Sequence, residues 1–201
     1  MSNFYNKDII ENAINGNKIF TKENQKEDFN KAFFHVFSLL KDAKNLYLSN
    51  SFSTSVFLSI TAIEEVAKTE IGLYQYSKDA DNEIKRTKDP LYNHKKKHII
   101  ALVGTVIMSQ RLVDSLGEKR CKELLTMAHN GDFVDIREKA LYCFRNNETF
   151  YIPSMVITKS LSKEILLLAI ECLNDRLIGY TNFTMSIDTD VNDLFDSVIR
   201  N

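Results

Sequence analysis

The chain has 201 residues, of which 44% are hydrophobic and 26% are charged, and its formal net charge at pH 7 is −1. This composition is that of a globular protein, and the length suits one domain with a sizeable core. The chain is not basic overall, so any contact with a polyanion needs a local basic patch. Six glycines and two prolines leave few chain-breaking residues, which argues against a many-turned β-sandwich and favours helices.

The cysteines and the N-terminal segment indicate the compartment. Cys121, Cys143 and Cys172 are odd in number and lack Cys-x-x-Cys spacing, which predicts reduced thiols. The segment MSNFYNKDIIENAING has no basic stretch followed by an apolar run, so we expect no signal peptide. The densest apolar run, EILLLAIECL, is shorter than the roughly 20 apolar residues that span a bilayer. We therefore expect a cytoplasmic protein.

In chain order, the first predicted elements are three helices. Residues 4–15 are expected to form a short helix that ends at Gly16. A long helix is predicted from about 26 to 49, because apolar residues recur there at three- and four-residue steps: Phe29, Phe33, Val36, Phe37, Leu40, Ala43 and Tyr47. After a turn at 49–51, Ser53 or Thr54 is expected to cap another long helix that ends near Gln75.

The middle of the chain alternates polar and helical segments. Residues 77–90 are polar, mixed in charge and closed by a proline, which predicts a loop. A helix is predicted from about Asn93 to Val113, led by the cluster HKKKH. A shorter helix follows from about Glu118 to Ala128, and Gly131 breaks it.

The last third of the chain contains three further segments. The stretch IREKALYCF is predicted to be helical and to stop before NNETFYIP, where Pro153 fixes a loop. A helix buried on most sides is predicted from about Lys159 to Tyr180. Asp188 or Thr189 is expected to cap a short terminal helix.

Together these elements predict an all-α fold, a helical bundle of four to five main helices that is up-and-down in its main part. We expect a single domain over residues 1–201, with a core bundle at 25–180 and terminal extensions at 1–24 and 181–201. The sequence shows no internal repeat and no low-complexity tract. Charged residues inside the helices are therefore the candidates for a functional site.

Two adjacent glutamates interrupt the apolar stretch FLSITAIEEVAKTEI, residues 57–71. Successive helical residues are about 100° apart, so a second stripe lies beside the core-facing one and is formed by Phe57, Thr61, Glu64 and Lys68. A surface pair between Glu64 and Lys68 is worth only about 0.2–0.5 kcal/mol. If the stripe instead faces another helix or a partner subunit, Glu64 needs a cation or hydrogen-bond donors. The sequence leaves both interpretations open.

The second charged feature is HKKKH, residues 94–98. It places cations at the start of a helix, where the helix dipole disfavours them. It is either a solvated charged face or a phosphate-contacting patch, the one local basic cluster in a near-neutral chain. His94 and His98 are four residues apart, but the intervening lysines repel a cation and HExxH is absent, so we expect no metal site.

The third feature is the stretch from Arg137 to Asn147. Arg137 and Tyr142 are five residues apart, about 140° round a regular helix, whereas Tyr142 and Arg145 share a face. The alternative is that Leu141 and Tyr142 pack while the arginines are solvated. Glycine-rich nucleotide loops, GxSxG and zinc-binding cysteine clusters are absent, which argues against dinucleotide enzymes, P-loop NTPases and α/β-hydrolases.

Three segments taken together, AKNLYLSNSFSTSVFLSITAIEEVAK, HKKKH and REKALY, resemble the AbiV-type abortive infection proteins of the HEPN (higher eukaryotes and prokaryotes nucleotide-binding) superfamily. The resemblance covers about residues 30–180 and depends on AxEExxK, HxxK and RExxLY in this order. It implies a helical bundle that pairs as a homodimer with a site at the subunit cleft. It also implies antiphage defence that arrests translation, and many HEPN proteins are metal-independent ribonucleases.

The usual HEPN motif, an arginine followed four to six residues later by a histidine, is incomplete in this sequence. Arg137 matches the arginine, but Tyr142 stands five positions on, and Arg145 has only Tyr151 in range. RNA cleavage needs a base for the 2′-hydroxyl and donors for the developing charge, and an unperturbed tyrosine with a pKa near 10 is a poor base. Either Tyr142 only positions the phosphate or another group is the base, and His94 is our candidate.

The predicted site has three groups of residues: catalytic Arg137, Tyr142 and His94; substrate-binding Lys97, Lys68 and Arg145; and the orienting carboxylates Glu64 and Glu65. We expect no metal and no other cofactor. The expected partners are a second copy of the chain, a phage-encoded activator, and RNA (rRNA, tRNA or mRNA), without a membrane. The predicted function is a latent ribonuclease that shuts down translation. The alternatives are a non-catalytic module that binds RNA or a translation factor, and a structural partner of a phage protein.

Overall fold

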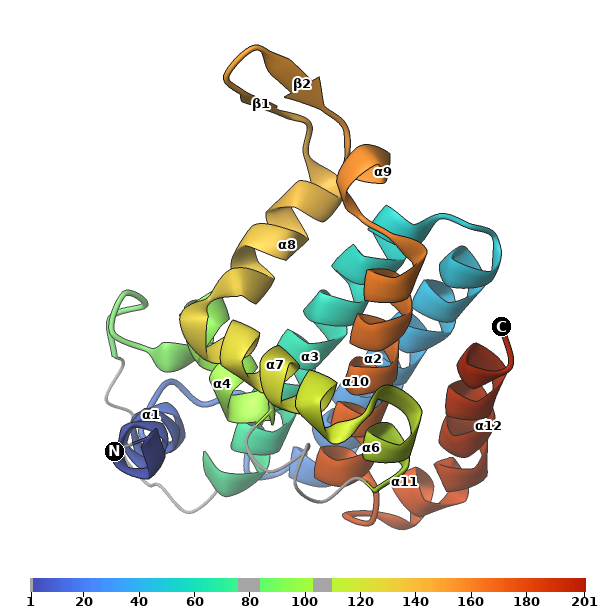
Figure 1. Ribbon diagram of the computed structural model, residues 1–201. Helices are drawn as coiled ribbons and strands as arrows, with labels where there is room; N and C mark the ends of the chain where they lie inside the picture. The colour runs from blue at the N-terminus through green and yellow to red at the C-terminus, as the bar shows by residue number, and fades with distance from the viewer. Residues whose placement is uncertain (1, 76–83, 103–109) are drawn as a thin grey trace.

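The computed structural model describes residues 2–75, 84–102 and 110–201, and within them the chain is almost entirely helical (Figure 1). The elements are α1 (Ser2–Ile14), α2 (Gln25–Leu48), α3 (Phe52–Tyr74), η2 (Pro90–Tyr92), α4 (His94–Leu102), α6 (Gln110–Leu116), α7 (Glu118–Asn130), α8 (Asp132–Leu141), β1 (Phe144–Asn146), β2 (Thr149–Tyr151), α9 (Pro153–Val156), α10 (Lys159–Leu177), α11 (Asn182–Ser186) and α12 (Asp188–Ile199). The prediction of an all-α fold is confirmed.

Helix α3 is the central element, because it packs against α2, α10, α4 and α8 (Figure 1). The apolar stripe predicted on α2 is buried along its whole length. Terminal segments join the same core, since Ile9 and Ala13 of α1 and Val191 and Phe195 of α12 belong to one cluster with it. Burial of this continuous apolar surface is the main force that holds the helices together.

The start of α3 differs from the prediction that Ser53 or Thr54 caps it. The residue at the N-cap is Ser51, without a capping hydrogen bond from its side chain. The turn before it is tight: Asn50 has a left-handed φ of 65°, and the Ser51 amide donates to the Leu46 carbonyl at 2.8 Å. This hydrogen bond terminates α2, and α3 begins at the next residue, Phe52, because the connection between the two helices is only three residues long.

The ends of the other helices differ less from the prediction. The helix predicted over 93–113 corresponds to α4 and α6 in part, and residues 103–109 lie outside the described residues, as do 76–83 of the predicted loop 77–90. Helix α10 ends three residues before Tyr180, because Gly179 takes a positive φ of 95°. Helix α12 begins at Asp188 after Ile187, so the prediction of an Asp188 or Thr189 cap is wrong.

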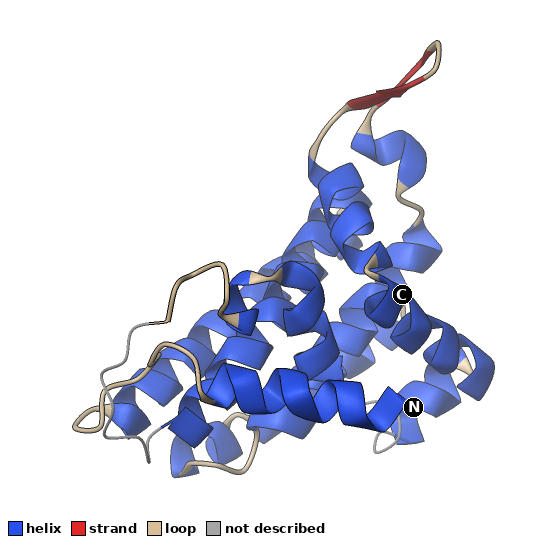
Figure 2. Ribbon diagram, turned by 90° about the vertical axis from the view of Figure 1, so that its left-hand side faces the viewer, coloured by secondary structure: helices blue, strands red, loops and turns tan. Residues whose placement is uncertain are grey.

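A β-hairpin replaces the predicted loop NNETFYIP. Helix α8 ends at Leu141, and β1 pairs antiparallel with β2 across a turn in which Asn147 has a φ of 52°. The rings of Phe144 and Tyr151 stack across the pair with centroids 5.1 Å apart, which favours strands over a continued helix. The hairpin projects from the helical body in both views (Figures 1 and 2). Tyr142 and Arg145 therefore do not share a helical face, contrary to the prediction.

A polar layer joins α10 to its neighbours. Arg176 of α10 pairs with Glu70 of α3 at 3.2 Å, and Arg111 of α6 pairs with Glu171. Asp175 lies beside this layer. Burial, followed by repulsion from Glu171, raises the pKa of Asp175 to about 6 in spite of Arg176 and Arg111. The folded state therefore binds a proton on this carboxyl more tightly than the unfolded chain does.

We expect Asp175→Asn to raise the free energy of unfolding at pH 8 by about 1–3 kcal/mol. The pKa rises on folding from 3.8 to about 6, so the wild-type protein loses stability as pH rises through this interval, and asparagine removes the loss. Urea denaturation at pH 4 and pH 8 measures the effect, with exposed Asp42→Asn as the control. An equal gain at both pH values would contradict this account.

Candidate functional site

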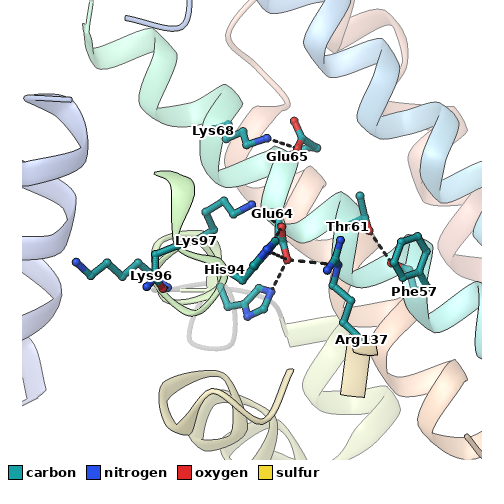
Figure 3. Close-up of polar contacts among 11 residues, drawn as sticks. Phe57, Thr61, Glu64, Glu65, Lys68, His94, Lys96, Lys97 and Arg137 are labelled. Carbon is teal, nitrogen blue, oxygen red and sulfur yellow. Dashed lines mark hydrogen bonds and ion pairs between the residues drawn. The ribbon is translucent and has the colours of Figure 1, made fainter. Parts of the chain in front are cut away.

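The carboxylate of Glu64 is the centre of a charged cluster where α3 meets α4 and α8 (Figure 3). Glu64 is only 3% exposed. Its Oε2 lies 2.8 Å from Nδ1 of His94 and accepts a hydrogen bond from Nζ of Lys97 at 2.5 Å. Its Oε1 lies 3.1 Å from Nε2 of His98 and 3.7 Å from Nε of Arg137. We call these five residues the Glu64 cluster.

Helix geometry brings these side chains to one carboxylate. His94, Lys97 and His98 occupy positions i, i+3 and i+4 of α4, which lie on one face of a helix. The amide of Lys96 donates to the Asn93 side chain at 3.0 Å, which caps α4 immediately before His94. Figure 3 shows that Lys96 itself points away from Glu64. One helical face of α4 therefore supplies three of the four groups that contact Glu64.

Arg137 is directed toward α3 by the buried face of α8. Phe133 and Ala140 are buried and lie four residues before and three residues after Arg137, so the three share a face. The guanidinium stacks over the ring of Phe57 at 4.9 Å from its centroid. The second stripe of α3, from Phe57 to Glu64, thus faces other helices, which is one of the two interpretations that the sequence left open.

The cluster keeps Glu64 ionised. Burial by itself raises the pKa of this carboxyl, but hydrogen bonds from His98 and Lys97, the charge of Lys97 and the contact with His94 outweigh burial, so the pKa lies well below its ordinary value. One carboxylate thus faces the cations Lys97 and Arg137 as well as two histidines. The cluster carries an excess of positive charge at neutral pH, which favours an anion nearby.

The two histidines have different environments. His98 is fully buried with its ring edge-on to Phe133, and burial lowers its pKa in spite of Glu64, so it is neutral at pH 7. The side chain of His94 is 44% exposed. Its Nδ1 lies 2.9 and 2.8 Å from the two carboxylate oxygens of Glu64, which orients the ring. An imidazole held in this way is chemically able to exchange a proton through its other nitrogen.

Arg137 has hydrogen-bonding capacity to spare. Its side chain is 24% exposed, and its Nε is buried without a hydrogen-bond partner among the described residues. A guanidinium has five N–H donors in a fork that matches the oxygens of a phosphate. Partial exposure beside a half-exposed histidine makes Arg137 and His94 the accessible members of the cluster.

The structure separates the other glutamate from the cluster. Glu65 pairs with Lys68 at 2.5 Å, and Figure 3 shows this pair apart from Glu64. In the part of the chain that the structure describes, the Glu65 carboxylate forms no ion pair with the cations of the Glu64 cluster, although it is predicted as an orienting carboxylate. The surface pair between Glu64 and Lys68, the other alternative that the sequence left open, is not found among the described residues, because Lys68 pairs with Glu65.

Tyr142 and Arg145 also lie outside the Glu64 cluster. Tyr142 follows the end of α8 in extended backbone, and its side chain is 63% exposed. Arg145 donates to the Glu148 carbonyl at 3.0 Å and lies over the ring of Phe150 within the hairpin. The early end of α8 carries both residues away from Arg137.

Sequence reasoning missed two residues of this site. His98 was considered only as a metal ligand, yet its i+4 spacing from His94 was the available indication that both face one partner. Phe57 enters the sequence prediction only as a member of the second stripe of α3, whereas its ring supports the guanidinium of Arg137. Among the described residues, no group of three or more His, Cys, Asp or Glu side chains is placed to hold a metal ion.

Comparison with known protein families identifies a relationship that covers most of the chain. The HEPN family model described as AbiV matches residues 26–174. The chain belongs to the AbiV family of HEPN proteins. All members of the Glu64 cluster lie within the matched range. Searches of curated proteins and of solved structures found no match.

AbiV-family membership indicates an abortive-infection defence protein of the HEPN type. HEPN domains commonly act as dimers and bind RNA. In the described ranges, every helix is too short or too polar to cross a membrane.

Proposed function

We propose that this AbiV-family protein is a latent, metal-independent ribonuclease that stops translation when a phage component triggers it. The observation that supports this proposal is the Glu64 cluster, in which one buried carboxylate faces two fixed cations and two histidines. Its accessible members, Arg137 and His94, are a phosphate-binding fork and an oriented imidazole. The same proposal includes a homodimer, which light scattering of the purified protein tests.

Each accessible group has a role in strand cleavage. His94 accepts the proton of the ribose 2′-hydroxyl through Nε2 as the 2′-oxygen attacks phosphorus. Arg137 stabilises the negative charge that develops on the phosphorane oxygens. The bond from phosphorus to the 5′-oxygen breaks, and water supplies the proton that completes the 5′-hydroxyl. Glu64 holds His94 in place, and buried Lys97 keeps Glu64 ionised.

Incubation of the purified protein with total bacterial RNA in EDTA tests the proposal. Half of the samples receive lysate from phage-infected cells, because the enzyme is proposed to be latent. Discrete fragments in the triggered samples would support a metal-independent ribonuclease, and the fragment ends would identify the target. Intact RNA in every sample while translation is still blocked in an extract would contradict it.

We expect His94→Gln to lower the cleavage rate by about 10²–10⁴-fold, the usual contribution of a general base. Glutamine keeps a polar side chain of similar length but cannot accept the proton. Because the His94 side chain is 44% exposed, we expect the variant to fold, and circular dichroism checks this. Single-turnover cleavage of a labelled RNA measures the rate, with exposed His35→Gln as the matched control. Equal loss in both variants would remove the base role from His94.

A second candidate is a non-catalytic module that grips RNA or a translation factor. The observation that favours it is Tyr142, which stands where the HEPN histidine is usual and is exposed outside the Glu64 cluster. The two candidates differ in whether RNA fragments with defined ends accompany the arrest of translation. Arrest without fragments, together with RNA retained on the protein, would support this second candidate.

A further inference from the structure

A pocket lies beside Lys68 of α3. It is lined by Asn17, Lys18, Ile19, Lys68, Asp89, Leu91 and Tyr92. Lys68 follows Glu64 by one helical turn, a rise of about 6 Å. Tyr92 precedes His94 by two residues. We call this feature the Tyr92 pocket. Two of its lining residues, Lys68 and Tyr92, are close in sequence to two members of the Glu64 cluster.

One wall of the pocket is fixed by the side chain of buried Gln75. Its Nε2 donates to the carbonyls of Ala13 at 2.9 Å and Asn17 at 3.0 Å. Its Oε1 accepts from the amide of Ile19 at 3.0 Å. These three bonds hold the segment that carries Lys18 against the end of α3. The wall is therefore formed before any ligand arrives, as is usual for small-molecule sites.

A second part of the lining is fixed by buried Asp89. Its carboxylate accepts from the amide of Asn17 at 3.2 Å and from that of Leu91 at 2.9 Å. The second bond shapes the η2 turn, in which Pro90 and Leu91 are buried. Anchoring of these two residues leaves the next one, Tyr92, at the surface with its side chain 50% exposed.

The lining combines aromatic, apolar and cationic groups. Tyr92 and Ile19 provide exposed apolar surface. Lys18 and Lys68 provide positive charge, and the guanidinium of Arg86 lies over one face of the Tyr92 ring, 4.4 Å from its centroid, so a base can stack only on the other face. Against these three cations stand Glu65, which pairs with Lys68, and Asp89, which is bound to backbone amides. An aromatic face with nearby cations is the usual platform for a base and its phosphate in single-stranded nucleic acid.

We propose that the Tyr92 pocket binds the nucleotide next to the phosphate held at the Glu64 cluster, with the base stacked on Tyr92 and its phosphate contacting Lys18 and Lys68. The inference rests on the proposed function, because it places the same RNA strand across both sites. It gives Lys68 a ligand in addition to its partner Glu65. It also separates the base, at Tyr92 of η2, from the scissile phosphate, at His94 of α4 and Arg137 of α8.

The test measures RNA affinity without cleavage. A short fluorescein-labelled single strand of 2′-O-methyl RNA lacks the attacking hydroxyl, and fluorescence anisotropy gives its Kd. Tyr92→Ala is expected to raise the Kd about 5- to 150-fold, the range for loss of one stacked base. Tyr92→Phe keeps the aromatic face and stays within about 2-fold of wild type. Phe34→Ala, which removes an exposed aromatic ring from α2, leaves the Kd unchanged.

Two further arms make the outcomes separable. If the pocket binds one nucleotide of an RNA strand, free UMP and AMP are expected to compete only weakly with the labelled RNA. Free nucleotides that bind as tightly as the RNA would overturn the assignment to a strand. RNA containing 4-thiouridine is expected to photocrosslink to the peptide that holds Tyr92. Crosslinks found only elsewhere would overturn the pocket.

The failure of this inference differs from the failure of the proposed function. If folded Tyr92→Ala and Lys18→Gln bind RNA as wild type does while Arg137→Ala does not, the pocket is wrong and the Glu64 cluster still contacts RNA. If wild-type protein binds no RNA, both are overturned. Circular dichroism confirms that each variant is folded.

Discussion

Arg137→Ala is expected to abolish translation arrest and to lower RNA cleavage by about 10²–10³-fold, the usual cost of removing one donor from a charge-stabilising site. The guanidinium stacks on Phe57 and lies 3.7 Å from Glu64, so its N–H groups are not committed to a short hydrogen bond with that carboxylate. Growth of cells that express each variant and single-turnover cleavage in EDTA measure the two effects.

Two variants test whether geometry or charge matters at this position. Arg137→Lys keeps the charge but loses the planar fork, so we expect it to recover only part of the activity. Arg200→Ala removes an exposed arginine from the end of α12 and is expected to have no effect. Full activity in a folded Arg137→Ala protein would remove Arg137 from the site.

Glu64→Gln is expected to destabilise the fold by about 3–5 kcal/mol, because it leaves the buried ammonium of Lys97 without a compensating charge. A protein of this size has only about 5–15 kcal/mol of stability in total, so part of the loss will show as poor expression. The pKa of Glu64 is lowered on folding, so its contribution is present above its ordinary pKa of 4.5 and is lost as pH falls. The difference in the free energy of unfolding between wild type and Glu64→Gln therefore becomes smaller at acidic pH. Urea denaturation at several pH values measures it.

The chain offers a matched control for this variant in the next residue. Glu65→Gln breaks the half-exposed pair with Lys68 and is expected to cost less than about 1 kcal/mol. A double variant, Glu64→Gln with Lys97→Met, removes the unpaired charge and is expected to recover at least half of the lost stability. Similar losses for both glutamates would show that Glu64 is not the centre of a buried network.

The parts of the fold that could be predicted from the sequence are those encoded by local periodicity. The stripe on α2 from Phe29 to Tyr47 is buried as expected, because its spacing alone specifies one face. The end of α8 could not be predicted in this way. IREKALYCF continues a helical pattern, but cross-strand stacking of Phe144 on Tyr151 stabilises a hairpin, and this contact becomes visible only when the strands are paired.

The sequence predicts which charged residues are candidates for the site, but it does not predict which of them contact one another. The sequence identifies the charged residues of α3, α4 and α8 as candidates, because they stand within or beside apolar stretches of predicted helices. It did not show which glutamate is buried, since Glu64 and Glu65 differ by only 100° of helical rotation. Burial of Lys97 was equally hidden, because lysine is almost never buried without a partner and that partner is supplied by another helix.

The shared carboxylate of Glu64 also constrains how this sequence can evolve. Because groups from α4 and α8 all contact it, a change at Glu64 disturbs several positions at once, and one compensating substitution such as Lys97→Met restores only part of the network. Glu65 lies outside this network, and a change there affects only its ion pair with Lys68. Neutral drift on this helix is therefore uneven, slow at Glu64 and faster at Glu65.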